Sequence, residues 1–119
     1  IAEAKKLTGS KFLLGATCNT ADDVFAAISD GADYIGMGPF RFTTTKKNLS
    51  AILGLEGYSN IMQKLQSHGL KMPIYAIGGI TVADLENLKQ TGIYGVAISS
   101  VILESQKPNE TIEQILKTF

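Results

Sequence analysis

Three threonines and two lysines follow an apolar stretch near the middle of the chain. The stretch DYIGMG, residues 33–38, has the composition of a buried strand, and TTTKK follows at 43–47. Three hydroxyl groups beside an ammonium group suit an oxyanion, because hydroxyls donate hydrogen bonds and lysine supplies a point charge. The glycine spacing of a Walker loop is absent from this segment. The residues concerned are Thr43, Thr44, Thr45, Lys46 and Lys47.

An alternative interpretation of these residues is a solvated loop of chance polar composition. The irregular segment that contains them spans 39–56. Structureless loops longer than about 12–15 residues are uncommon in compact domains and are often functional. The length of the segment therefore favours a role in binding or catalysis.

Small and hydroxyl-bearing residues also end three other apolar stretches. Paired glycines let the backbone approach a ligand closely. In a parallel sheet the carboxyl ends of the strands meet at one edge, so these residues are predicted to share a site for an anionic ligand. Each of them alone also fits an ordinary strand residue, a turn or a helix cap. They are Thr17 at the end of 11–17, Gly78 and Gly79 in 73–79, and Ser99 and Ser100 at the end of 94–99.

Strand-like and helix-like segments alternate along the chain. Two capping boxes, Thr20 with Asp23 and Thr81 with Asp84, indicate where two of the helices begin. This alternation is typical of parallel βαβ units and predicts an α/β fold, either a (β/α) barrel or a doubly wound sheet. The predicted strands are 11–17, 33–38, 73–79 and 94–99, and the predicted helices are 1–7, 21–30, 58–69, 82–92 and 110–119.

The predicted strands are too few for a closed barrel of eight. The other half is therefore either missing from this sequence or supplied by another chain. Because the sequence starts at Ile1 within a helical segment, we interpret residues 1–119 as one domain that is a piece of a longer protein.

The amino-acid composition limits the kinds of molecule that the chain is expected to bind. The chain is 45% hydrophobic and 18% charged, and its 11 basic residues balance 11 acidic ones. This balance argues against non-specific binding to nucleic acid or to a membrane surface, but a phosphorylated small molecule needs only a local site. No apolar run approaches the roughly 20 residues of a membrane span. A single cysteine fits a reducing compartment, and we expect a cytoplasmic protein.

Several reactive or aromatic residues receive structural interpretations. Cys18 is expected to be a small buried apolar residue, because no histidine lies near it in the sequence. His68 precedes Gly69 and is expected to lie at a helix end. Three tyrosines at similar strand positions are expected to pack rather than to stack on a base, and they are Tyr34, Tyr75 and Tyr94.

The strand ends taken together resemble one family. The motifs are GAT-C-N-T, GADYIGMGPF, T-T-T-K, P-I-Y-A-IGGI and GVAISSVI, in the order of the thiamine phosphate synthase and thiazole tautomerase family and with nearly its spacing. The resemblance covers almost all of the chain. It implies a (β/α)₈ TIM barrel of which this chain holds strands five to eight, and a transferase of thiamine biosynthesis. Family enzymes join a pyrimidine methyl diphosphate to a thiazole phosphate carboxylate, releasing diphosphate and, after decarboxylation, thiamine phosphate.

The same resemblance implies roles for individual residues. Lys46 matches a catalytic lysine on the pyrimidine diphosphate, and Thr17 takes the place of a serine near that group. Gly79, Ser99 and Ser100 match a cup for the thiazole phosphate. The resemblance also implies Mg²⁺, whose acidic ligands belong to strands before residue 1, so this chain alone is expected to be inactive. The threonines expected to bind substrate are Thr43, Thr44 and Thr45, with Thr43 and Thr45 on the thiazole.

Departures from the family pattern leave alternatives open. Asn19 replaces a histidine that tautomerases use as acid or base, which favours the synthase. Phe42, with Arg41 before it, replaces a proline. A tautomerase-like paralogue, a phosphate-binding half-barrel without activity and a different barrel enzyme with a similar cup remain as alternatives. An open half-barrel exposes sheet edges, so a homo-oligomer is also expected.

Overall fold

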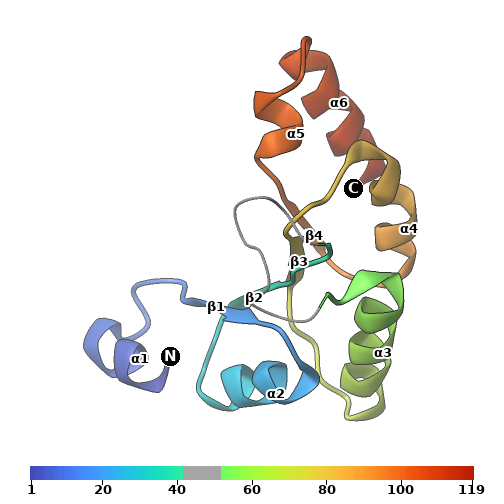
Figure 1. Cartoon of the computed structure of the whole chain (residues 1–119). Coiled ribbons are helices and arrows are strands. Elements are labelled where there is room, and N and C mark those ends of the chain that lie inside the picture. Colours follow the sequence, from blue (N-terminus) through green and yellow to red (C-terminus); the bar gives the residue numbers. More distant parts are fainter. Residues whose placement is uncertain (42–51) are drawn as a thin grey trace.

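A computed structural model describes residues 1–41 and 52–119 of the chain. Four short strands form one parallel sheet in the order β1-β2-β3-β4, which confirms the predicted α/β fold (Figure 1). The strands are β1 (Gly15–Cys18), β2 (Tyr34–Met37), β3 (Ile74–Ile77) and β4 (Gly95–Ala97).

Helices follow the strands as the alternating pattern predicts. The helix after β2 begins at Gly54, earlier than the predicted residue 58, and the segment predicted as one helix over 82–92 starts as a 3₁₀ turn. The helices are α1 (Ala2–Thr8), α2 (Ala21–Ser29), α3 (Gly54–Ser67), the 3₁₀ helix η1 (Val82–Asp84), α4 (Leu85–Gln90), α5 (Ser100–Leu103) and α6 (Pro108–Thr118).

Both predicted capping boxes are present. At the start of α2 the Thr20 hydroxyl accepts a hydrogen bond from the Asp23 N–H at 3.1 Å, and the Asp23 carboxylate accepts one from the Thr20 N–H at 3.2 Å. At η1 the Asp84 carboxylate accepts hydrogen bonds from the N–H and the hydroxyl of Thr81, at 2.7 and 2.9 Å. Such boxes satisfy backbone N–H groups that have no partner within the first turn of a helix. They therefore fix the residue at which the loop after each strand ends and the helix begins.

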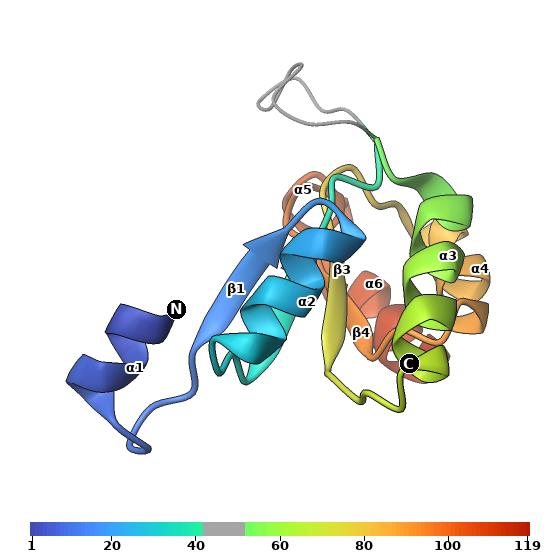
Figure 2. The same cartoon turned by 90° about the horizontal axis from the view of Figure 1, so that it is seen from below.

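The hydrophobic core lies between one face of the sheet and the helices. Ile35, Met37, Ile74 and Ala76 are fully buried on that face, because side chains alternate between the two faces of a strand. Helices α2, α3 and α4 lie along the sheet, whereas α1 stands apart from it (Figures 1 and 2). The next residues along each strand point to the opposite face of the sheet.

The strand predicted over 11–17 is shorter in the structure. Phe12 and Leu13 are 61% and 79% exposed, and the strand begins only at Gly15. The carboxylate and N–H of Asp33 bind the backbone of Leu14 at 2.8 and 2.7 Å, so the segment is tied down at its last residue. None of the helices described here is both long and apolar enough to cross a membrane.

Candidate phosphate-binding site

A cavity of about 540 Å³ opens beyond the carboxyl ends of β3 and β4. Gly79 reaches it from the turn after β3, and Ser99 and Ser100 reach it from the start of α5. The sequence predicted that these three residues meet, and the structure places them around one space. We call this cavity the cup.

The turn after β3 has a backbone that favours glycine. Gly78 and Gly79 have φ angles of +87° and +69°, in the left-handed region. A Cβ atom on Gly79 would overlap the Cγ of Arg41, and one on Gly78 would lie 3.0 Å from Pro39. Residues 39–41 therefore pack closely against the two glycines. The same two glycines also line the cup.

Arg41 and Asp84 form an ion pair that sequence reasoning missed. The two guanidinium nitrogens Nη1 and Nη2 donate to the two Asp84 carboxylate oxygens at 2.6 and 2.8 Å. Nη1 also donates to the Gly79 carbonyl at 2.7 Å. Hydrogen bonds from the guanidinium hold the pKa of Asp84 below its usual value. The capping box showed Asp84 in the sequence, but no local pattern pairs it with Arg41.

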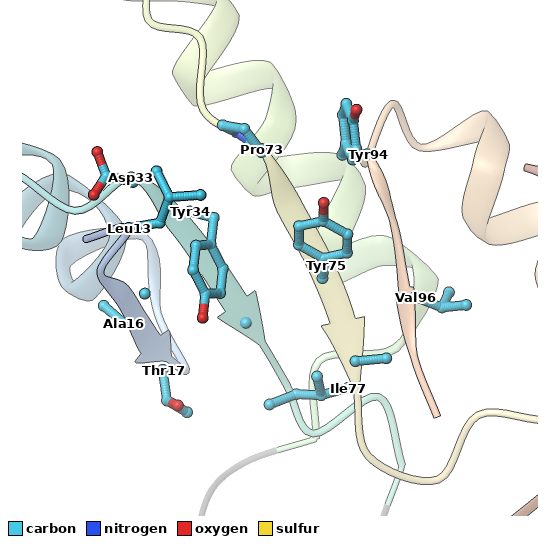
Figure 3. Close-up of a pocket in the computed structure, with 13 residues that line it drawn as sticks. Leu13, Ala16, Thr17, Asp33, Tyr34, Pro73, Tyr75, Ile77, Tyr94 and Val96 are labelled. Carbon is cyan, nitrogen blue, oxygen red and sulfur yellow. The ribbon is translucent and has the colours of Figure 1, made fainter. Parts of the chain in front are cut away.

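A second cavity, of about 720 Å³, covers the face of the sheet opposite the core (Figure 3). Thr17 lines this cavity at the end of β1 and does not line the cup. Ile77 and Ala97 line both spaces, so the two cavities adjoin. Thr17 therefore lies on the same side of the sheet as the cup, but two strands away from β3.

Three tyrosine rings form a row across this second cavity. The ring centroids of Tyr34 and Tyr75 are 6.2 Å apart, and those of Tyr75 and Tyr94 are 5.4 Å apart, in edge-to-face arrangements. Gly15 lies beside the row, where a Cβ atom would overlap the Tyr34 ring. The predicted packing role is confirmed, because the rings contact one another. Tyr34 and Tyr94 remain 41% and 68% exposed.

Asn19 joins the exits of β1 and β2. Its side-chain Nδ2 donates to the Gly38 carbonyl at 2.5 Å, and its N–H donates to the Asp23 carboxylate at 3.0 Å. The backbone of Asn19 thus contributes to the cap of α2, while its amide group is bound to the neighbouring strand exit.

The remaining single residues are placed as the sequence predicts. Cys18 is 1% exposed. His68 ends α3, with its Nδ1 2.8 Å from the Lys64 carbonyl and its ring 5.0 Å from that of Phe25.

Burial of Cys18 predicts that its thiol reacts slowly. Desolvation raises the pKa of Cys18 to about 11, so at pH 8 the folded chain holds the unreactive protonated form. We expect a chromogenic disulfide reagent to label Cys18 at least about tenfold more slowly in the folded protein than in denaturant, because the thiolate is the reactive form. Equal rates in the two conditions would contradict the buried position.

The threonine and lysine segment lies outside the described part of the chain. Thr43, Thr44, Thr45 and Lys46 fall within 42–51, so their predicted roles stay predictions. Within residues 1–41 and 52–119, no three histidine, cysteine, aspartate or glutamate side chains gather as a metal site would require. The described residues therefore supply no set of ligands for the predicted Mg²⁺.

The fold and the cup define a class of protein. A parallel α/β sheet whose strand exits carry glycines and serines around a common cavity is typical of α/β proteins that bind phosphorylated small molecules. Residues 1–102 match the model of the family described as thiamine monophosphate synthase, and the chain belongs to this family.

Individual relatives agree with this assignment. The chain is 47% identical over 116 residues to a thiamine-phosphate synthase of Bacteroides fragilis and 48% identical over 116 residues to one of Phocaeicola vulgatus. Each match covers 98% of this chain but only 57% and 56% of the relative. A thiamine phosphate pyrophosphorylase structure from Pyrococcus furiosus superimposes with a TM-score of 0.81 at 26% identity, over 99% of this chain and 54% of that one. The chain thus spans about half the length of the relatives it matches.

Proposed function

We propose that the four strands are strands five to eight of a (β/α)₈ barrel with thiamine phosphate synthase activity. The parallel order β1-β2-β3-β4, without a reversal, suits consecutive strands of a barrel better than a doubly wound sheet. The tyrosine-lined face opposite the helices would then face the barrel interior. The observation that carries the activity is the meeting of Gly79, Ser99 and Ser100 at one cavity in a chain of this family.

The proposed substrates are two phosphorylated small molecules. The cup is assigned to the phosphate of the thiazole phosphate carboxylate, where serine hydroxyls and backbone N–H groups would donate hydrogen bonds. Thr17, across the adjoining cavity, is assigned to the side of the pyrimidine diphosphate. This separation lets two anionic substrates occupy neighbouring spaces and brings their reacting atoms together.

The reaction needs no nucleophile from the protein. As the bond between the pyrimidine methylene carbon and the diphosphate oxygen breaks, its electron pair leaves with the diphosphate. The thiazole nitrogen then donates its lone pair to the methylene carbon. Loss of the thiazole carboxylate as carbon dioxide, with uptake of a proton at the same ring carbon, completes thiamine phosphate. Lys46 is proposed to stabilise the growing negative charge on the leaving diphosphate. Mg²⁺, if held by residues of a preceding half, would supply a Lewis acid for the diphosphate.

The test of this proposal is a hybrid barrel. In it, the amino-terminal part of the Bacteroides fragilis relative precedes residue 1 of this sequence. We expect the hybrid barrel to form thiamine phosphate from the two substrates and to release diphosphate and carbon dioxide, with the product measured by chromatography and the diphosphate by a coupled assay. A folded hybrid barrel that binds neither substrate would contradict the proposal.

The arrangement of Asn19 favours the synthase over a thiazole tautomerase. A tautomerase needs an acid or base at this position, whereas the amide of Asn19 is bound to the Gly38 carbonyl. Turnover of the thiazole tautomer by the hybrid barrel without formation of thiamine phosphate would favour the tautomerase instead. Cytoplasmic location and homo-oligomer formation stay predictions, the latter from two sheet edges that the described strands leave open.

Glu104 places a carboxylate on the lining of the cup. A negative charge there opposes the binding of a phosphate, although its exposure to water weakens the effect. We expect Glu104→Gln to lower the KM for the thiazole phosphate by about threefold at low salt, with the difference shrinking as salt screens the charge. An unchanged KM at low salt would place the phosphate elsewhere.

A further inference from the structure

We infer that Arg41 and Asp84 are positioning residues for the phosphate cup, holding the Gly78–Gly79 turn in the conformation that receives the phosphate. This inference rests on the proposed function for the identity of the phosphate-bearing substrate. The positioning role of the Arg41–Asp84 ion pair rests on the geometry alone.

Arg41 fixes the turn through both its backbone and its side chain. Its N–H donates to the Gly78 carbonyl at 3.2 Å, and its Nη1 donates to the Gly79 carbonyl at 2.7 Å. The guanidinium carbon also lies 4.7 Å from the centre of the Phe40 ring, and the Phe40 N–H is shared between the carbonyls of Ile77 and Gly78 at 3.0 and 3.1 Å. Two consecutive residues after β2 are therefore attached to the turn after β3.

Asp84 closes the arrangement from the other end. The same carboxylate that binds the guanidinium accepts two hydrogen bonds from Thr81. Its side chain is 14% exposed and that of Arg41 is 43% exposed, so the pair is partly shielded from water. A bidentate arginine–carboxylate pair has a defined orientation, which a surface lysine does not provide. The segment 79–84 is thus held at its first carbonyl and at its capping aspartate.

The consequence for the cup concerns the direction of a peptide group. In a trans peptide the carbonyl and the following N–H point in opposite directions. Binding the Gly79 carbonyl to Arg41 therefore turns the Ile80 N–H away from Arg41. Among the residues that the structure describes, the N–H groups of Gly79 and Ile80 donate no backbone hydrogen bond, and both residues line the cup. Released from Arg41, the carbonyl is free to rotate toward the cup, where its oxygen would repel a phosphate.

Two substitutions separate positioning from simple attraction of charge. If Arg41 only attracted the anion, Arg41→Ala would weaken phosphate binding and Asp84→Asn would strengthen it, because it removes a negative charge. If the pair positions the turn, both substitutions weaken binding. In the hybrid barrel we expect each to raise the Kd of inorganic phosphate, measured by calorimetry, by about tenfold. We expect the KM of the thiazole phosphate to rise with it while the KM of the pyrimidine diphosphate changes less than twofold.

The pair of Lys5 and Asp33 provides a matched control. It joins at 2.7 Å with side chains 26% and 31% exposed, and Asp33 precedes β2 at the opposite end of the sheet from the cup. Lys5→Ala should lower the unfolding temperature without changing the Kd of phosphate.

Arg41→Lys should recover less than half of the phosphate-binding free energy that Arg41→Ala loses, because an ammonium group cannot hold two carboxylate oxygens and a carbonyl in one plane.

The outcomes distinguish this inference from the proposed function. Tighter phosphate binding by Asp84→Asn, full recovery by Arg41→Lys, or equal loss of affinity in Lys5→Ala would each overturn the positioning role. A hybrid barrel that makes no thiamine phosphate but loses phosphate affinity in both Arg41→Ala and Asp84→Asn would overturn the function and support the inference. An active hybrid barrel whose variants keep their phosphate affinity would do the reverse.

Discussion

Alanine in place of Lys46 is expected to lower the kcat of the hybrid barrel by about 10²- to 10³-fold, the usual effect of removing a group that stabilises charge formed in the transition state. The leaving diphosphate gains negative charge as its bond to carbon breaks, so a lysine in the proposed position would contribute more to the transition state than to the bound substrate. The KM of the pyrimidine diphosphate should therefore change less than kcat does. Initial rates over a range of both substrates provide the measurement.

The neighbouring Lys47 is the control for this substitution. Lys47→Ala removes the same charge one residue further along the chain, and we expect it to change kcat less than about threefold, because the resemblance assigns the diphosphate contact to Lys46. Circular dichroism and the unfolding temperature of both variants should match the parent hybrid barrel. Equal losses of kcat in the two variants would show that only the total charge of the segment matters and would remove the specific role of Lys46.

Local signals in the sequence were sufficient for the order of the strands and helices, although the helix predicted over 82–92 starts as a 3₁₀ turn. Thr20 with Asp23 and Thr81 with Asp84 bind their own neighbours, so their capping boxes depend on residues only three apart. The strands could be predicted from their apolar residues alone, because these residues are buried on the face of the sheet that the helices cover. Because the ends of parallel strands converge at one edge of the sheet, the meeting of Gly79 with Ser99 and Ser100 could be predicted without any knowledge of side-chain contacts.

Contacts between distant segments account for what the sequence did not show. Helix α3 begins at Gly54 because the N–H groups of Leu53 and Gly54 donate to the carbonyls of Pro39 and Phe40, at 2.9 and 3.2 Å. The ion pair of Arg41 and Asp84 likewise depends on how the exits of β2 and β3 lie against each other. Neither contact has a periodic signal, so a prediction from spacing alone could place the cup but not the residues that hold its turn.

Gly79→Ala tests the fit between Arg41 and the turn through stability. Alanine at a φ of +69° costs about 1 kcal/mol in backbone strain, and overlap with its neighbour adds about 2 kcal/mol more. The added methyl group would overlap the Arg41 Cγ and lie 2.8 Å from the Arg41 carbonyl oxygen. We therefore expect the free energy of unfolding of the hybrid barrel to fall by about 3 kcal/mol, measured with urea. The Kd of inorganic phosphate should rise as well.

Gly69 supplies the matched comparison. Its φ is +67°, and a Cβ atom there would meet nothing within 4 Å. Gly69→Ala therefore carries the same backbone strain and the same reduction of unfolded-state freedom without the overlap, and should cost only about 1 kcal/mol. The difference between the two glycines measures the contact with Arg41. Equal costs would mean that the turn moves freely away from Arg41, contrary to the attachment seen in the structure.

Removing the Arg41 side chain should rescue part of the loss. In the Arg41→Ala background, the Cγ atom that the new methyl group overlaps is gone, while the carbonyl oxygen of residue 41 remains close. Gly79→Ala should then cost about 1 kcal/mol less than it does beside the arginine, a coupling within the range expected for residues in contact. Strictly additive costs would show that the strain at Gly79 arises from its own backbone and from the carbonyl of residue 41 rather than from the arginine side chain. A coupling of the expected sign would show that glycine is required at 79 because the arginine side chain lies on it.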